Sequence, residues 1–150
     1  MIRPPFNFRL ERVRALRETV EGQAREELAA SLSMRMKGEA MLEAAMSTMS
    51  DAQAARRSAV GASAQELVAI QAYLERTERA REAAALELDR RDAEVDARRS
   101  TLHGAARDRQ VLERLKERQR ADHQRETNRR ESVVLDEMAI TAHRRAEAGR

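Results

Sequence analysis

The sequence predicts an all-α protein in which two long helices fold back on each other as an antiparallel coiled-coil hairpin. Charged residues make up 37% of the chain and aromatic residues only 2%, so the large rings that supply much of the buried area in a compact core are nearly absent. The enrichment in Ala, Glu, Arg and Leu is typical of long helices. The two prolines, Pro4 and Pro5, precede the first periodic segment, so no obligatory helix breaker follows them.

The first helix is expected over residues 8–46 of a single domain that spans 1–150. A turn region is expected at 47–63, where serines are frequent, large apolar residues are scarce, and Gly61 suits a left-handed turn. Within the helix, apolar residues recur every three or four positions, as they do on one helix face. They are Leu10, Val13, Leu16, Val20, Ala24, Leu28 and Leu32, followed by Met34, Met36, Met41, Leu42, Ala45, Met46 and Met49.

The second helix is expected over residues 64–146 and has the clearest periodicity. Ser63 followed by Glu66 predicts a capping box at its start. The apolar phase is expected to slip at His103–Gly104 and to resume at Leu112. Two series with a spacing of seven predict a coiled-coil seam. They are Leu67, Leu74, Arg81, Leu88, Val95 and Leu102, and Ile70, Thr77, Ala84, Arg91, Arg98 and Ala105.

Charge is unevenly distributed along the chain. The net charge is +3, with five Arg against two Glu in residues 1–20 and twelve Arg or Lys against nine acids in residues 106–150. In an antiparallel hairpin these two basic segments lie at the same end, where we expect an acidic partner. Five Glu–Arg pairs have the i,i+4 spacing that supports an exposed helix. They are Glu21–Arg25, Glu75–Arg79, Glu87–Arg91, Glu94–Arg98 and Glu126–Arg130.

The residue types argue against a catalytic or metal site. The chain has no cysteine, which excludes a disulfide, a thiolate ligand and a thiol nucleophile. The histidines, His103, His123 and His143, are spread along the sequence and are expected to be solvated or to pack. The sequence contains no glycine-rich phosphate loop and no membrane-spanning apolar run. Residues 1–10 lack the apolar run of a signal peptide, so none is expected. We therefore expect a cytoplasmic protein that is not an enzyme and needs no cofactor.

Three segments resemble the flagellar FliJ family. Residues 8–18 read FRLERVRALRE, residues 112–119 read LERLKERQ, and residues 135–139 read LDEMA and precede Arg144–Arg145. The length, the central turn and Tyr73–Leu74 also agree, so the resemblance covers the whole chain. It implies a stalk protein of the flagellar type III export apparatus, cytoplasmic and peripherally associated with the inner membrane at the flagellar base.

This resemblance also implies the partners. Family members sit in the pore of the hexameric flagellar export ATPase, promote its ring assembly and activity, contact the cytoplasmic domain of the export-gate membrane protein, and escort export chaperones. The gate contact maps onto Met46, Met49, Tyr73 and Leu74. The ATPase contact maps onto charges at the two ends that a coiled-coil seam does not need. They are Arg9, Arg12, Arg14, Lys116, Arg118, Asp136 and Glu137.

Two alternatives remain open on the sequence alone. An injectisome secretion system uses an equivalent stalk with the same fold. Paired arginines such as Arg56–Arg57 and Arg129–Arg130 also fit an architectural nucleic-acid-binding coiled coil. Acidic residues are interleaved with these arginines, so no nucleic-acid partner is expected. The alternatives differ in salt dependence, because DNA binding falls steeply with salt.

Overall fold

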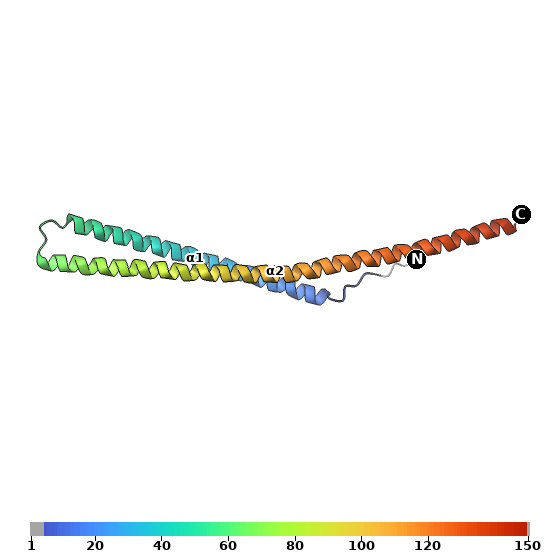
Figure 1. Ribbon diagram of the computed structural model, residues 1–150, viewed down its shortest axis with the longest axis horizontal. Coiled ribbons are helices and arrows are strands. Elements are labelled where there is room, and N and C mark those ends of the chain that lie inside the picture. Colours follow the sequence, from blue (N-terminus) through green and yellow to red (C-terminus); the bar gives the residue numbers. More distant parts are fainter. Residues whose placement is uncertain (1–4, 150) are drawn as a thin grey trace. The chain divides into compact units, whose positions relative to one another are not determined.

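The computed structural model describes residues 5–149, which form two long helices joined by a short loop (Figure 1). Helix α1 is Glu11–Ser58 and helix α2 is Ala64–Ala148, with no strand among the described residues. The protein is therefore all-α, as the sequence predicts. By their contacts the residues divide into two compact units, and the single domain expected over 1–150 stays a prediction. The terminal unit comprises Met1–Thr19 and Ala106–Arg150, and the central unit is Val20–Ala105.

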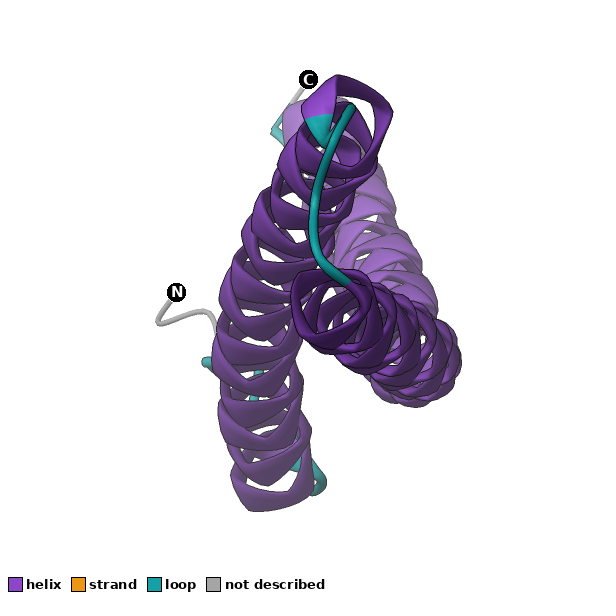
Figure 2. Ribbon diagram, turned by 90° about the vertical axis from the view of Figure 1, so that its left-hand side faces the viewer, coloured by secondary structure: helices purple, strands orange, loops and turns teal. Residues whose placement is uncertain are grey.

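The two helices run antiparallel in the central unit. Glu27 pairs with Arg98, and Arg35, further along α1, pairs with Asp92, which precedes Arg98 on α2. The residue numbers of the paired side chains thus increase along α1 while those of their partners on α2 decrease. Because an antiparallel pair needs only a short connection, the loop between the helices is brief, as the teal segment in Figure 2 shows. The central unit is a helical hairpin.

Helix α1 extends further than the sequence suggested. It continues through residues 47–58, which were expected to form a turn. Two features explain the difference. Thr48 and Ser58 donate their hydroxyls to backbone carbonyls one turn earlier, at 2.9 and 3.2 Å, so these polar side chains are satisfied within the helix. Ala52 is only 2% exposed, so this part of α1 packs rather than turning away.

The loop and the start of α2 have the predicted chemistry. Gly61 has a φ of 87°, in the left-handed region that glycine adopts without strain. The Ser63 hydroxyl accepts a bond from the Glu66 backbone N–H at 3.3 Å, and the Ser63 N–H donates to the Glu66 carboxylate at 2.7 Å. These bonds hold the pKa of Glu66 below its ordinary value. The capping box therefore starts α2 at Ala64.

The predicted seam of α2 is the face that packs in the central unit. Thr77, Val95 and Ala105 are buried, at 5%, 2% and 8% exposure. The other members of the two series are half-buried, except Leu67, which is 49% exposed near the loop. A spacing of seven keeps one stripe facing a partner helix along a coiled coil. The heptad prediction for this helix is confirmed.

The predicted stripe of α1 is wrong for most of its large residues, whereas Ala24 is buried and the other inner members are half-buried, namely Leu28, Leu42, Ala45 and Met49. Leu16 and Met36 are exposed, at 61% and 67%. Apart from Glu21, which is 3% exposed, the buried positions have a spacing of seven and carry small residues. They are Ala24, Ser31, Gly38 and Ala52, with the half-buried Ala45 at the intervening position.

Gly38 shows why small residues are needed opposite α2. A Cβ atom at this position would lie 3.0 Å from Cδ of Arg91 and 3.4 Å from Leu88. The Arg91 stem crosses α1 there, and its Nη1 donates to the Met34 carbonyl at 2.6 Å. Arginine at an inner position of one helix thus requires space on the other. A stripe defined by large apolar residues misses that requirement.

Most of the predicted i,i+4 pairs form. Four of the five are ion pairs, including Glu87–Arg91 at 2.9 Å and Glu126–Arg130 at 3.0 Å. In the fifth pair, Arg79 Nε donates instead to the backbone carbonyl of Glu75 at 3.1 Å. Each such pair contributes only a few tenths of a kcal/mol. Together they favour helix on faces that bury little.

Candidate functional site

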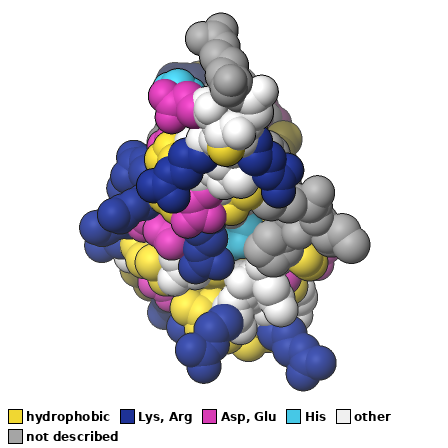
Figure 3. Space-filling model, turned by 90° about the vertical axis from the view of Figure 1, so that its right-hand side faces the viewer, with side chains coloured by type: hydrophobic (Ala, Val, Ile, Leu, Met, Phe, Trp, Pro, Cys, Tyr) yellow, Lys and Arg dark blue, Asp and Glu magenta, His cyan; other side chains and the backbone are white. Residues whose placement is uncertain are grey.

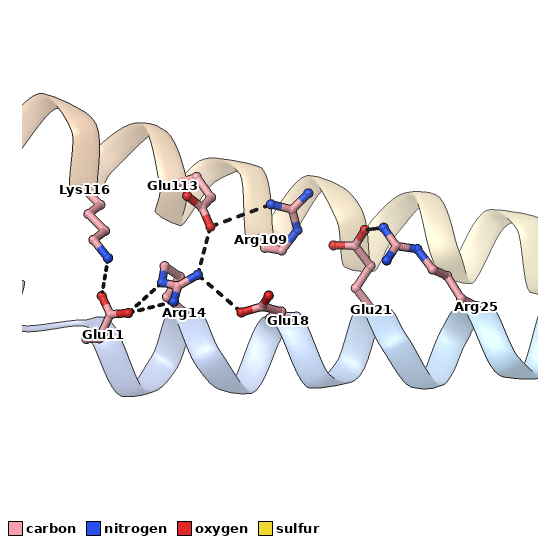
Figure 4. A network of polar contacts seen from close by, with 8 residues as sticks. All are labelled: Glu11, Arg14, Glu18, Glu21, Arg25, Arg109, Glu113 and Lys116. Atoms are coloured by element: carbon pink, nitrogen blue, oxygen red, sulfur yellow. Dashed lines mark hydrogen bonds and ion pairs between the residues drawn. The ribbon is translucent and has the colours of Figure 1, made fainter.

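The terminal unit contains an ion-pair network between the start of α1 and the middle of α2 (Figure 4). Lys116 Nζ donates to the Glu11 carboxylate at 2.8 Å. The Arg14 guanidinium donates to Glu11 at 2.7 Å and to Glu113 at 3.0 Å. Arg14 therefore bridges a carboxylate of its own helix and one from α2. The four side chains form one continuous network.

Two further contacts extend this interface in opposite directions. Arg17 pairs with Asp108 at 3.0 Å, one turn further along α1. Before the start of α1, the ring of Phe6 packs against His123 with 5.7 Å between centroids, and Phe8 is 4% exposed. Residues 5–19 thus lie antiparallel along residues 106–123. His123 packs there, as the sequence suggested for the histidines.

The network favours the charged forms of Glu11 and Arg14. Hydrogen bonds from Arg14 and then Lys116 lower the pKa of Glu11. Hydrogen bonds to Glu11 and Glu113 raise the pKa of Arg14. Both shifts have the same cause, since a bonded opposite charge favours the ionised form.

The structure gives two of the predicted ATPase-contact residues an internal role. Arg14 and Lys116 were expected to be surplus to a coiled-coil seam, but both form ion pairs across the terminal unit. The predicted phase slip at His103–Gly104 is absent as well. Helix α2 is continuous there, and Arg109 and Lys116 extend the spacing of seven from Leu102 as half-buried polar residues.

The other predicted contact residues are open to solvent. Arg9, Arg12 and Arg118 are exposed and form no ion pair with any residue from 5 to 149. Asp136 and Glu137 are likewise exposed, and their carboxylates form no ion pair within the described range. In the view toward the C-terminal end of α2, Lys and Arg side chains project on several sides with acids between them (Figure 3). These charges are available to a partner.

The predicted gate-contact residues lie in the central unit near the loop. Met49 and Leu74 line one groove of about 380 Å³ between the helices, with Arg56 and Glu78 among its other lining residues. Met46 and Tyr73 do not line this groove but are exposed, at 55% and 48%. The structure therefore brings one pair of the four residues together and leaves the others on the surface.

No sequence pattern singled out the other ion-pairing residues of the terminal unit, which are Glu11, Arg17, Asp108 and Glu113. The spacing of seven from Leu67 reaches Arg109 and Lys116 if it is followed without requiring apolar residues, so it points to the stretch of α2 that contains Asp108 and Glu113 but not to these residues themselves. The sequence does not show which residue pairs with which across the two helices, because partners such as Arg14 and Glu113 are 99 positions apart.

Within residues 5–149 no three His, Asp or Glu side chains gather closely enough to hold a metal ion. Neither α1 nor α2, as described, has an apolar stretch that could cross a bilayer.

These features define a coiled-coil protein of the helical-hairpin class, whose candidate sites are charged helix surfaces. The sequence matches a family described as Flagellar FliJ protein over residues 6–148. The chain belongs to the flagellar FliJ family. That family is a non-catalytic component of the flagellar protein export apparatus. No curated protein and no solved structure matches the chain.

Proposed function

We propose that this chain is the stalk of the flagellar type III export ATPase. In this role it binds in the pore of the hexameric ring, promotes ring assembly and ATP hydrolysis, and links the ring to the export gate and to export chaperones. It acts on the cytoplasmic side, peripherally associated with the inner membrane at the flagellar base. The observation that carries the proposal is the family match, which extends over both ends of the chain.

The terminal unit supplies the surface for the ATPase. Arg9, Arg12 and Arg118 are exposed basic residues without an ion-pair partner among the described residues. Such charges attract an acidic partner and accelerate association with it. Arg14 and Lys116 are engaged within the unit, so their first role is to hold it together. Asp136 and Glu137 offer exposed carboxylates to basic groups of the ring.

Turnover of the purified flagellar export ATPase, measured with and without this protein at physiological salt, tests the proposal. We expect a several-fold rise with the wild-type chain. The triple variant Arg9→Glu, Arg12→Glu and Arg118→Glu should lose this stimulation while its far-UV circular dichroism stays helical. The reason is that the substitutions reverse charges that form no ion pair within the described chain.

A matched control reverses the same number of charges elsewhere. Lys37, Arg57 and Arg76 are exposed residues of the central unit that likewise form no ion pair among the described residues. Replacing all three by Glu should leave stimulation intact. Equal loss in both triple variants would show that net charge matters and the surface does not. If the folded wild-type chain gives no stimulation, the stalk role is refuted; DNA binding that weakens steeply with salt would then favour the nucleic-acid alternative.

The gate contact is the second part of the proposal. Met49 and Leu74 share a groove, and Met46 and Tyr73 add exposed apolar surface in the same region of the chain. Methionine surfaces are adaptable and suit partners of varied shape. Replacing the exposed Met46 and Tyr73 by Ser should weaken binding to the cytoplasmic domain of the gate protein, measured by calorimetry, and leave ATPase stimulation unchanged. Unaltered gate binding would exclude these two residues from the contact.

A further inference from the structure

The contact that closes the terminal unit is built differently from the one that closes the central unit. Among the described residues of the terminal unit, Phe8 is the one buried apolar residue. Leu10 is 38% exposed, and Leu112 and Leu115 are only half-buried. The ring pair of Phe6 and a series of ion pairs also join residues 5–19 to α2. Little apolar area therefore holds this segment in place.

The ion pairs themselves are accessible to solvent. Arg17 and Asp108 have side chains 45% and 51% exposed, and Glu11 is 44% exposed. Even Arg14, the central residue of the network, is 19% exposed. Ion pairs between exposed groups are weak and are screened by salt. Their strength in this unit therefore depends on ionic strength.

The central unit has ion pairs too, but they are accompanied by buried side chains. Ala24, Ala52 and Val95 are each at most 5% exposed, and Gly38 is in close contact with Leu88 and Arg91. Apolar burial and close packing do not weaken with salt, which if anything strengthens them. Rising salt should therefore weaken the contact of the terminal unit and leave the packed contact of the central unit in place.

We propose that residues 5–19 form a releasable clasp on α2, held by the Glu11, Arg14 and Arg17 ion pairs and opened by rising ionic strength or by a charged partner. Opening separates Arg14 from Glu113, Arg17 from Asp108 and Lys116 from Glu11. It also uncovers the half-buried Leu112 and Leu115. The clasp rests on the contacts of the terminal unit alone and does not depend on the proposed ATPase role.

Distance measurements between spin labels test the clasp directly. The chain has no cysteine, so two introduced cysteines are labelled uniquely. Ala15→Cys with Gln110→Cys places exposed labels on the two sides of the clasp. Between ~0.01 M and ~1 M NaCl the screening length falls about tenfold. We expect a distant population to grow several-fold over this range, with helicity by circular dichroism retained.

A matched pair in the central unit provides the control. Ala29→Cys with Ala97→Cys labels exposed positions on α1 and α2 there, and its distance should not change with salt. Identical distributions for the clasp pair at both salt concentrations would overturn the proposal. Widening of the control pair to the same extent would also overturn it, because the opening would then be general.

Charge reversal gives an independent readout at constant salt. In the clasp-labelled protein, Arg17→Asp places two carboxylates opposite each other and should raise the open population several-fold at low salt. Adding Asp108→Arg restores an opposite-charge pair in the reversed sense and should close the clasp again. An open population that Arg17→Asp does not change, or that Asp108→Arg fails to reduce, would show that these charges do not hold the clasp.

Discussion

Replacing Val95 by alanine tests whether the heptad seam of α2 stabilises the central unit. Val95 is 2% exposed, so the substitution removes two methyl groups from a buried position. At about 0.8 kcal/mol for each group the loss is about 1.6 kcal/mol, and the cavity left behind adds to it. Alanine is the better helix former by about 0.5 kcal/mol. The net expectation is a destabilisation of about 1.5 kcal/mol.

The assay is urea and thermal unfolding followed by circular dichroism at 222 nm. For a chain of this length a loss of that size lowers the melting temperature by roughly 3–6 °C. The control is Leu86→Ala, which removes more atoms but from a side chain that is 55% exposed. It should change the free energy of unfolding by less than about 0.5 kcal/mol. If the two variants unfold at the same urea concentration, the seam as described does not carry the stability of this unit.

Two further predictions concern packing and pH. Gly38→Leu displaces the Arg91 stem from its close contact and should destabilise the protein by about 1–3 kcal/mol in urea unfolding; Gly22→Leu, where a Cβ meets nothing within 4 Å, should instead be slightly stabilising. The reasoning fails if both glycine variants shift stability the same way. Glu11 has a pKa lowered from 4.5 by Arg14 and Lys116, so its contribution to stability is full above about pH 4.5 and is lost as the pH falls through the lowered value. Glu11→Gln should therefore be less stable than wild type at pH 7 and should lose less stability on acidification, and parallel acid curves would contradict this.

The sequence by itself determined the α-helical hairpin and the fact that most of its side chains are exposed. The series from Leu67 to Leu102 identified the packed face of α2, because a period of seven is a local property of one helix. Ser63 and Glu66 marked the start of that helix, because a capping box involves only neighbouring residues. Both features depend on short-range geometry, which the order of residues fixes directly.

Only the tertiary structure decided which face of α1 packs and where the charges pair. Gly38 faces inward where Arg91 and Leu88 of α2 need space, and that need appears only when the helices are side by side. Arg14 finds its carboxylate partner 99 positions away on α2, so its role depends on the register between two helices. From the sequence alone, a long charged side chain is equally compatible with solvent exposure and with an ion pair. The register between the two helices decides which of these occurs.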